Sequence, residues 1–306
     1  MEGTIMRSTG SFYEVLAEDG STYTCRVRGK IRLEGIKETN PIAVGDRVSF
    51  DLDNEFGNIN EILPRENHIL RQSIKKTGHA HVLAANVDQV LLVVTLAYPR
   101  TSLGFIDRFL VSAESFRIPQ IIVFNKKDLL DEESMVYVRE LMKLYQSIGV
   151  TCFSISAVGH DVDLDEIIKV LENKTTLVAG HSGVGKSTLL NKISPELQQS
   201  IGEISEFSSK GKHTTTFAEM FRISKDTFVI DTPGVKELGL VDMTQQEISD
   251  YFPEMRDLRL SCKFGSKCLH INEPKCAIIE QVELGTIALS RYESYISMVL
   301  GEDNRK

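Results

Sequence analysis

The sequence lacks the long apolar runs that mark secreted and membrane proteins. Residues Met1 to Gly10 contain no apolar stretch of the kind that a signal peptide requires. The longest apolar run, Val90 to Ala97, is far shorter than the roughly 20 residues that span a bilayer. We therefore expect a cytoplasmic protein with no membrane partner, and we expect it to act as a monomer.

Cysteine and positive charge are also scarce. Five cysteines in 306 residues are too few for a disulfide scaffold, although three of them lie close together near the C-terminus. Acidic residues outnumber basic ones by 43 to 35, and the resulting net charge of −8 excludes a protein that coats nucleic acid along its whole length. With 42% hydrophobic and 25% charged residues, the composition is globular, which excludes collagen, coiled coil and global disorder.

The hydrophobic pattern divides the chain into three segments. In residues 1–72, short runs alternate apolar and polar residues between glycine-containing turns, which predicts a small β-barrel of the oligonucleotide-binding (OB) type. Residues 73–245 alternate buried-strand and helix patterns, which predicts an α/β domain with a mainly parallel sheet. Residues 246–306 contain the clustered cysteines and show helical spacing, and they predict a small, mainly helical domain.

A phosphate-binding loop follows the apolar strand pattern at Thr175–Ala179. The segment from Gly180 to Ser187 matches G-x-x-x-x-G-K-[ST] and leads into a predicted helix, as this motif requires. Backbone N–H groups of such a loop surround phosphate, Lys186 would reach the β- and γ-phosphates, and Ser187 would bind Mg²⁺. The nucleotide-binding residues predicted in this loop are Gly180, His181, Ser182, Gly183, Val184, Gly185, Lys186, Ser187 and Thr188.

Two further loops indicate which base is bound. The sequence Asn125-Lys126-Lys127-Asp128 comes directly after the predicted strand Ile121–Phe124, at the strand end where ligands bind in parallel sheets. A carboxylate at Asp128 would accept from both N1–H and the exocyclic amine of guanine, and adenine has no such pair of donors. Ser156 and Ala157 end the next predicted strand, and their backbone would support guanine O6. These loops predict GTP rather than ATP.

Two segments are expected to sense the γ-phosphate. Asp231 follows the predicted strand Thr227–Ile230 and would hold Mg²⁺ through water, while the Gly234 N–H would bind the γ-phosphate. Thr215 would ligate Mg²⁺ only in the triphosphate state. Loss of the γ-phosphate is therefore expected to release both segments.

Together these motifs resemble the GTPase G domain, in an unfamiliar order. In Ras-like chains the phosphate loop comes first and N-K-x-D fourth, whereas here Asn125–Asp128 precede Gly180–Ser187. We interpret the domain as circularly permuted, which a packed sheet tolerates because it depends on which strands are neighbours and not on chain order.

The permuted domain, the N-terminal barrel and the C-terminal cysteines together resemble the RsgA family of ribosome small-subunit-dependent GTPases. The resemblance implies a bacterial cytoplasmic GTPase that acts late in maturation of the small ribosomal subunit, near the decoding region. It also implies that the barrel and the zinc domain both contact rRNA.

The residues after Asp231 indicate slow catalysis. Val235 stands where many GTPases have a water-orienting glutamine, and an aliphatic side chain cannot orient water, so we predict slow hydrolysis alone and faster hydrolysis on the subunit. The resemblance points to His213 as the residue that helps to position water. The alternative is that His213 is a loop histidine without a catalytic role.

The clustered cysteines indicate a structural zinc site. Three thiolates and one imidazole are the ligand set of a closed zinc site, which leaves no open position for catalysis, and the alternative is a group of unpaired thiols. Cys25 and Cys152 lie in strand patterns and are expected to pack in cores. Because the zinc segment follows Asp231–Gly234, we hypothesise that loss of the γ-phosphate reorients it. The predicted zinc ligands are Cys262, Cys268, His270 and Cys276.

A basic stretch in the first segment is a candidate RNA contact. Arg26, Arg28, Lys30 and Arg32 are alternate residues without an intervening acid, so an extended strand would place them on one face. Such a face can follow a phosphate backbone, although a charge run can equally be a solvated surface. A second, weaker candidate consists of Lys75, Lys76, His79 and His81.

The leading hypothesis is a GTPase that binds the small ribosomal subunit with GTP, assists its late maturation and leaves after hydrolysis, with Mg²⁺ and one zinc ion as cofactors. A second is an RNA-binding module that uses nucleotide only as an occupancy switch, with negligible turnover. A third is a P-loop ATPase. Phosphate release with and without subunits separates the first two, and the base specificity of Asp128 tests the third.

Overall fold

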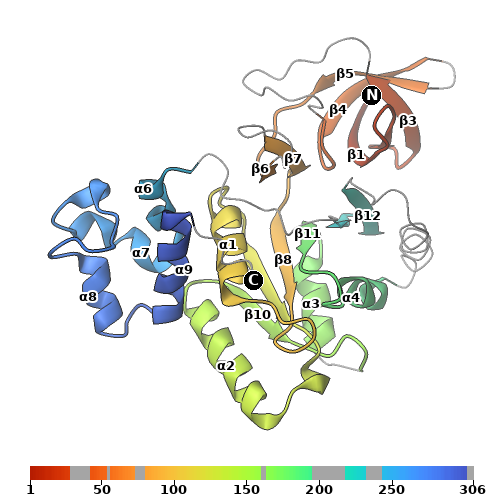
Figure 1. The fold of residues 1–306 in the computed structure, drawn as a ribbon. Helices are drawn as coiled ribbons and strands as arrows, with labels where there is room; N and C mark the ends of the chain where they lie inside the picture. The colour runs from red at the N-terminus through yellow and green to blue at the C-terminus, as the bar shows by residue number, and fades with distance from the viewer. Residues whose placement is uncertain are drawn as a thin grey trace.

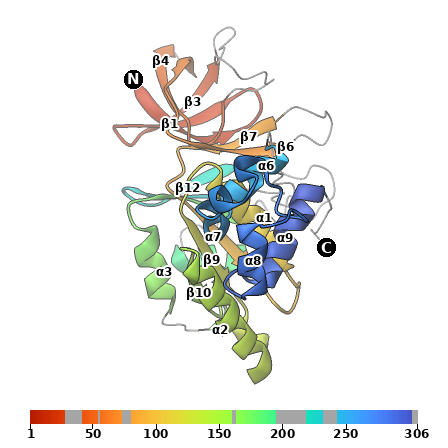
Figure 2. The same ribbon diagram turned by 90° about the vertical axis from the view of Figure 1, so that its left-hand side faces the viewer.

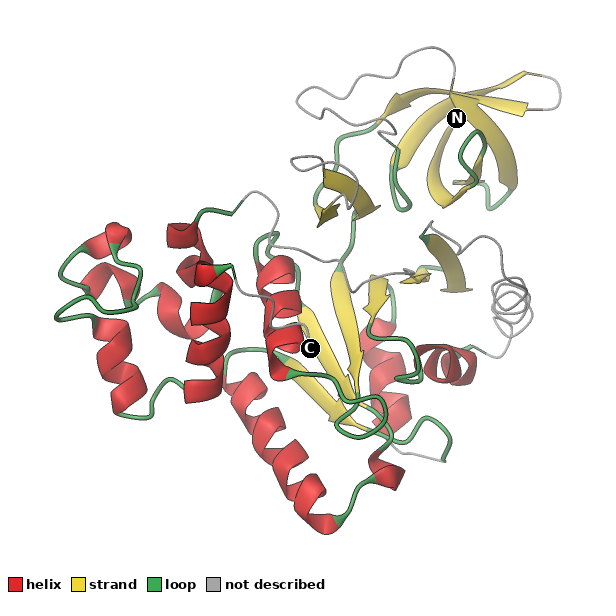
Figure 3. Cartoon of the chain, in the orientation of Figure 1, coloured by secondary structure: helices red, strands yellow, loops and turns green. Residues whose placement is uncertain are grey.

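Three bodies follow one another along the chain: a barrel, a sheet with helices on both faces, and a group of helices (Figure 1). The structure is a computed structural model, and it describes residues 1–27, 42–53, 56–72, 80–159, 163–194, 218–231 and 243–301. Figure 3 shows that the first body is built of strands and the last of helices.

The N-terminal barrel closes on itself. It consists of β1 (Glu2–Ser8), β2 (Tyr13–Ala17), β3 (Thr22–Val27), β4 (Arg47–Asp53) and β5 (Phe56–Ile62). β1 pairs with both β2 and β4, β2 pairs with β3, and β5 completes the ring by pairing with β3 and β4. The predicted OB-type barrel is therefore confirmed. Its fully buried core includes Ile5, Val15, Cys25, Val48, Phe50 and Ile59.

A hairpin that the sequence pattern does not predict joins the barrel to the next body. It consists of β6 (His68–Gln72) and β7 (Ala80–Ala85), so it lies across the expected boundary between residues 72 and 73. The Ala85 N–H donates to the Val44 carbonyl over 2.9 Å. Gly45 has a φ of +87°, and a Cβ there would lie 2.1 Å from the Ala85 carbonyl oxygen. Glycine is therefore required for this close approach.

The second body is built on a mainly parallel sheet, as predicted. Its strands β8 (Gln89–Val94), β9 (Gln120–Phe124), β10 (Thr151–Ser154), β11 (Thr175–Ala179) and β13 (Thr227–Asp231) run parallel, and β12 (Glu219–Ser224) is antiparallel to β13. The spatial order is β10-β9-β8-β11-β13-β12, and β12 also pairs with β1 of the barrel. The strand that leads into the phosphate-loop motif, β11, follows β8, β9 and β10 in the chain, whereas the phosphate loop comes first in Ras-like chains, and this order agrees with circular permutation.

Helices cover both faces of this sheet. α1 (Leu103–Glu114) and α2 (Glu132–Ser147) share a core with Val90, Leu92 and Val94 of β8. α3 (Asp163–Leu171) and α4 (Lys186–Ile193) share a core with the alternate residues Leu91 and Val93. Every residue of β8 is buried, as expected of a strand covered on both faces.

The C-terminal helices pack against α1 (Figure 2). They include α6 (Gln245–Ile248), α7 (Pro253–Arg256), α8 (Ala277–Glu283) and α9 (Leu289–Leu300). α8 and α9 are separate helices because Gly285, two residues after the end of α8, takes a φ of +74°. In the part of the chain that the structure describes, no helix is long and apolar enough to cross a membrane.

A buried charge cluster fixes the contact between α1 and α9. Arg291 of α9 is 1% exposed and donates to Asp107 of α1 over 2.7 Å and to Glu254 of α7 over 2.7 and 3.2 Å. Its guanidinium carbon lies 4.5 Å from the ring centre of Phe252, and Tyr145 of α2 donates to Asp107 over 3.0 Å. The second and third bodies are therefore joined by the buried ion pair of Arg291 and Asp107, which would be broken if the two bodies separated.

Candidate functional site: a nucleotide site and a metal centre

The phosphate loop joins the central strand β11 to α4. Gly180 has a φ of +142°, and a Cβ there would lie 2.3 Å from the Val93 carbonyl oxygen. Gly185 has a φ of +97°, and a Cβ there would lie 2.3 Å from Nδ2 of Asn125. Both positions therefore require glycine. The loop ends at the N-terminus of α4, where unpaired N–H groups favour an anion.

Lys186 lies across the phosphate loop. Its Nζ donates to the carbonyl oxygens of Gly180 and His181 over 2.7 and 3.0 Å. Burial lowers the pKa of Lys186, and the Asp231 carboxylate opposes that shift. Other residues that are predicted to contact the nucleotide are exposed to solvent. In the loop and the first turn of α4 they include Ser182, Gly183, Ser187 and Thr188.

Asn125 connects three of the predicted motifs. Its Nδ2 donates to the Val184 carbonyl over 2.8 Å, and its Oδ1 accepts from the Ala157 N–H over 3.0 Å. Both bonds are buried. The phosphate loop and the two base-reading loops are therefore tied together by one side chain.

The base-reading residues are held by their own bonds. Asp128 accepts from the Ser156 hydroxyl over 2.5 Å, which fixes the carboxylate that is predicted to read guanine. Lys126 has a left-handed φ of 64°, and its Nζ donates to the Tyr98 carbonyl over 2.6 Å. Lys127 donates instead to the Ser154 carbonyl over 3.2 Å. The two lysines therefore anchor this loop to neighbouring strand ends.

Asp231 is placed beside the phosphate loop. It ends β13 and is paired in register with Val178 of β11, two residues before Gly180. The oxygen donors of Asp231 and Ser187 suit Mg²⁺, which prefers hard oxygen ligands. The other predicted switch residues, His213, Thr215 and Gly234, lie outside the described residues.

Two contacts to this site are not apparent from the sequence patterns. The ring of His181 stacks on Phe105 of α1 with centroids 4.0 Å apart. Glu219, the first residue of β12, is paired in register with Asp231. Burial raises the pKa of Glu219; Arg7 opposes this shift, whereas Glu14 and Asp231 add to it. The contact of His181 with Phe105 joins segments far apart in sequence, for which local patterns carry no signal, whereas Glu219 and Asp231 face each other across the hairpin of β12 and β13.

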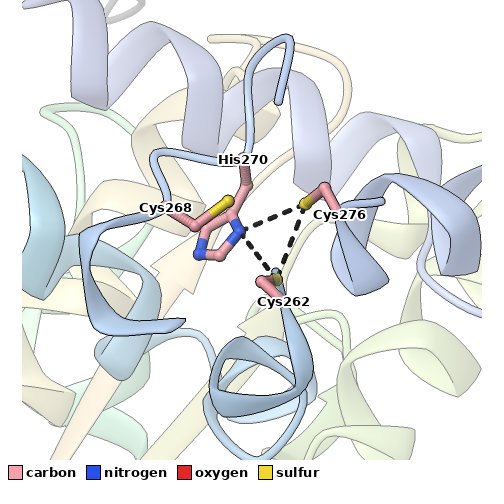
Figure 4. A group of neighbouring side chains, drawn as sticks. All are labelled: Cys262, Cys268, His270 and Cys276. Atoms are coloured by element: carbon pink, nitrogen blue, oxygen red, sulfur yellow. Dashed lines mark hydrogen bonds between the residues drawn. The ribbon is translucent and has the colours of Figure 1, made fainter. Parts of the chain in front are cut away.

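The four predicted metal ligands converge in the C-terminal body (Figure 4). Sγ of Cys262 lies 3.7 Å from Sγ of Cys276 and 3.5 Å from Nδ1 of His270, which lies 3.3 Å from Sγ of Cys276. Zinc bonds of about 2.3 Å to sulfur and 2.0–2.1 Å to nitrogen give tetrahedron edges of roughly 3.8 Å (S–S) and 3.6 Å (S–N). All four ligand atoms, including that of Cys268, lie within 4.8 Å of one another. The donor set and its spacing therefore fit zinc.

Neighbouring side chains support the metal loop. Tyr292 and Tyr295 of α9 donate to the carbonyls of His270 and Leu269 over 2.6 and 2.8 Å. The Glu273 carboxylate accepts from the N–H groups of Leu269, Ile271 and Asn272, and its pKa is lowered because these bonds outweigh its burial. Cys152, by contrast, packs in a core, and burial raises the pKa of its thiol to about 12.

The predicted RNA face is described in part. Arg26 lies on β3, and its Nε donates to the side chain of Asn58 on β5 over 3.2 Å. Arg28, Lys30 and Arg32 lie outside the described residues, as do Lys75, Lys76 and His79, while His81 lies in β7.

A cavity of about 260 Å³ lies elsewhere, between the second and third bodies. Its lining includes Glu114 of α1, Gln120 at the start of β9, Val150 just before β10, and Tyr251. It lies at the amino ends of these strands, whereas the nucleotide motifs that the structure describes lie at the carboxyl ends, where ligands bind in such sheets.

Comparison with known proteins agrees with this geometry. The family model described as RsgA GTPase matches residues 62–241, and that of the RsgA N-terminal domain matches residues 2–58. A protein of Christiangramia forsetii named small ribosomal subunit biogenesis GTPase RsgA is 49% identical over 99% of this chain and 97% of its own. A Bacteroides thetaiotaomicron relative, named small ribosomal subunit biogenesis GTPase RsgA 2, is 48% identical over 100% of this chain and 98% of its own.

Two solved structures share the whole fold. The crystal structure of YjeQ from Thermotoga maritima superposes with a TM-score of 0.78 at 36% identity, covering 100% of this chain and 99% of that one. YloQ, described as a circularly permuted GTPase, gives a TM-score of 0.73 at 34% identity, covering 100% of this chain and 96% of that one. With the family model spanning more than half of its length and its motifs meeting at one permuted sheet, this chain belongs to the RsgA GTPase family.

Proposed function

We propose that this chain hydrolyses GTP in the service of small ribosomal subunit biogenesis, slowly alone and faster when it is bound to the subunit. The observation that carries the proposal is the pair of buried bonds from Asn125 to Val184 and Ala157. They bring the phosphate loop and the two base-reading loops to one place. The names of the relatives supply the ribosomal context.

The roles proposed at the nucleotide site follow from the chemistry of each group. Lys186 and the loop N–H groups neutralise the phosphates, and Asp128 selects guanine by accepting from its two N–H donors. Ser187 and Thr215 ligate Mg²⁺, with Asp231 acting through water, and the Gly234 N–H binds the γ-phosphate. Hydrolysis alone is slow because Val235 cannot orient water.

His213 is proposed to orient the attacking water when the chain is bound to the subunit. The variant His213→Ala should then lose most of the subunit-stimulated rate, while its affinity for GTP stays unchanged. Normal stimulated turnover in this variant would remove the catalytic role of His213.

The metal centre is proposed to hold one structural zinc through Cys262, Cys268, His270 and Cys276. The three cysteines lie in the core of the C-terminal helices with Phe252 and Tyr295, so a bound metal would contribute directly to the folding of this segment. We further propose the division into residues 1–72, 73–245 and 246–306 as OB, GTPase and zinc-binding domains.

The barrel is proposed to contact rRNA through Arg26, Arg28, Lys30 and Arg32, with the zinc domain as a second contact. A positive surface on an OB-type barrel suits a phosphate backbone. A ribosome biogenesis factor of this kind would act in the cytoplasm as a monomer, with GTP and GDP as its small ligands.

Phosphate release in the presence and absence of purified small subunits tests the proposal. We expect slow release alone and clear stimulation by small but not large subunits, together with co-sedimentation that is stronger with a GTP analogue than with GDP. Negligible turnover in both conditions, with nucleotide-dependent co-sedimentation, would favour the alternative of an RNA-binding module switched by nucleotide.

A further inference from the structure

Two connections join the barrel to the GTPase sheet, and they reach opposite ends of its strands. The hairpin β6–β7 leads into the amino end of β8, where the Asp88 N–H donates to Thr175 at the start of β11. The pairing of β1 with β12 lies at the carboxyl ends of the parallel strands. Its register partners are Arg7 and Glu219, and Glu219 is paired with Asp231 at the carboxyl end of β13. The second connection therefore reaches the strand ends that carry the nucleotide loops.

A row of charged side chains crosses this end of the sheet, with one base between an acid on the barrel side and two acids on the sheet side. In register, Glu14 of β2 faces Arg7 of β1, Arg7 faces Glu219 of β12, and Glu219 faces Asp231 of β13. Directly opposed residues of antiparallel strands point to the same face, with Cβ atoms about 4.5–5.5 Å apart. Nη1 of Arg7 lies 3.6 Å from Oε1 of Glu219, and their side chains are 40% and 19% exposed.

The row lies on the same face as the phosphate loop. Phe221 of β12 and Val229 of β13 share a core with Leu189 and Leu190 of α4. Because side chains alternate along a strand, Glu219 and Asp231, each two residues away, point to that same face. Lys186 begins α4, so the row of charged side chains leads from the barrel toward the phosphate site.

We propose that Arg7 and Glu219 transmit binding at the barrel to the nucleotide site, with Glu219 as a positioning residue for Asp231. This inference rests on the proposed function, because it concerns how the subunit stimulates turnover. A shift of the barrel moves Arg7 away from Glu219. Glu219 then faces the neighbouring Asp231 carboxylate without its paired cation.

Charge reversal of the pair tests this proposal. The variants are Arg7→Glu, Glu219→Arg and the double exchange, with Arg47→Ala as the matched control. Arg47 makes a comparable exposed ion pair with Glu2 over 3.2 Å within the barrel and has no part in the row. Single-turnover hydrolysis is measured with and without small subunits, together with co-sedimentation and the affinity for a fluorescent GTP analogue.

Arg7→Glu should lose about fivefold or more of the subunit-stimulated single-turnover rate, the lower range of coupling between sites. Its co-sedimentation should stay unchanged, and the double exchange should recover stimulation. Amide hydrogen exchange in β12 should respond to subunit binding in the wild-type protein but not in Arg7→Glu, which a purely structural role for Arg7 does not predict.

The opposing results are distinct. Full stimulation of Arg7→Glu, or equal loss in Arg47→Ala, would overturn the coupling while leaving the proposed function intact. Failure of the double exchange to recover any stimulation would show that the two residues do not act as a pair. If small subunits do not stimulate the wild-type protein, the proposed function itself fails.

Discussion

Arg291→Met should weaken the attachment of the C-terminal helices to α1 by about 3–5 kcal/mol, the loss expected when one partner of a buried ion pair is removed. Methionine keeps much of the apolar stem, so the change chiefly removes charge and hydrogen bonds. The variant leaves Asp107, which is 1% exposed, and Glu254 without their common cation. Burial opposes the charged guanidinium, but both carboxylates hold the pKa of Arg291 above its usual value.

Urea unfolding followed by far-ultraviolet circular dichroism measures the loss, since the chain has no tryptophan to report it. The transition of the C-terminal helices is assigned by hydrogen exchange in α9, because unfolding of several bodies need not be two-state. Glu293→Gln is the matched control, since Glu293 is an exposed residue of the same helix. That surface change should stay within about 0.5 kcal/mol.

A loss below about 1 kcal/mol for Arg291→Met would refute the reasoning, because it would place the site in the range of surface ion pairs. A triple variant with Asp107→Leu, Glu254→Gln and Arg291→Met should recover stability relative to Arg291→Met alone, since it leaves no unpaired buried charge. If the triple variant is less stable than Arg291→Met, repulsion and desolvation are not the cause.

Three further predictions concern the two sites. Asp128→Asn should shift preference from guanosine to xanthosine nucleotides by about tenfold or more, because an amide can donate to the C2 oxygen of xanthine, and unchanged preference in competition binding would contradict the role of Asp128. Gly185→Ala should lower the affinity for GTP, as measured by calorimetry, because its Cβ would lie 2.3 Å from Nδ2 of Asn125. The control Gly149→Ala, at a position with a φ of +89° and no atom within 4 Å, should bind GTP normally. Cys276→Ser should lower the zinc content from one ion per chain and lower the melting temperature of the C-terminal helices; wild-type protein purified without zinc would argue against the site.

The sequence predicts those parts of the molecule that are set by short-range patterns. Alternation in Thr22–Val27 and the apolar run of β8 lead directly to a barrel strand and a buried parallel strand. The phosphate loop is predictable because its glycines and Lys186 lie close together in the sequence. The zinc ligands are predictable for the same reason, since Cys262 and Cys276 enclose the whole set.

Long-range pairings are not predictable from such patterns. Arg291 reads as a surface residue of an amphipathic helix, and its burial depends on Asp107, which is 184 residues away. Asn125 is expected at the base, but its bonds to Val184 depend on strand order rather than on local pattern. The hairpin β6–β7 is missed because its strands are short and lie across a change in composition.

The buried cluster also limits the hypothesis that loss of the γ-phosphate reorients the zinc-binding body. Separation from α1 would break the buried pair of Asp107 and Arg291, although Glu254 would stay paired with Arg291 within the C-terminal body. Any such reorientation is therefore expected to move α1 together with the C-terminal helices, and a distance label pair within α1 and α9 should not change between the GTP-analogue and GDP states.

The central place of β11 has a consequence for synthesis on the ribosome. β8 is made early and pairs with β9 on one side, but its other edge pairs with β11, which begins only at Thr175. At about 5–20 residues per second, that apolar edge stays open on the order of ten seconds during translation. A nascent chain stopped before Thr175 would display an unpaired strand ready to join another chain, so truncated products of this gene are expected to depend on chaperones or to aggregate.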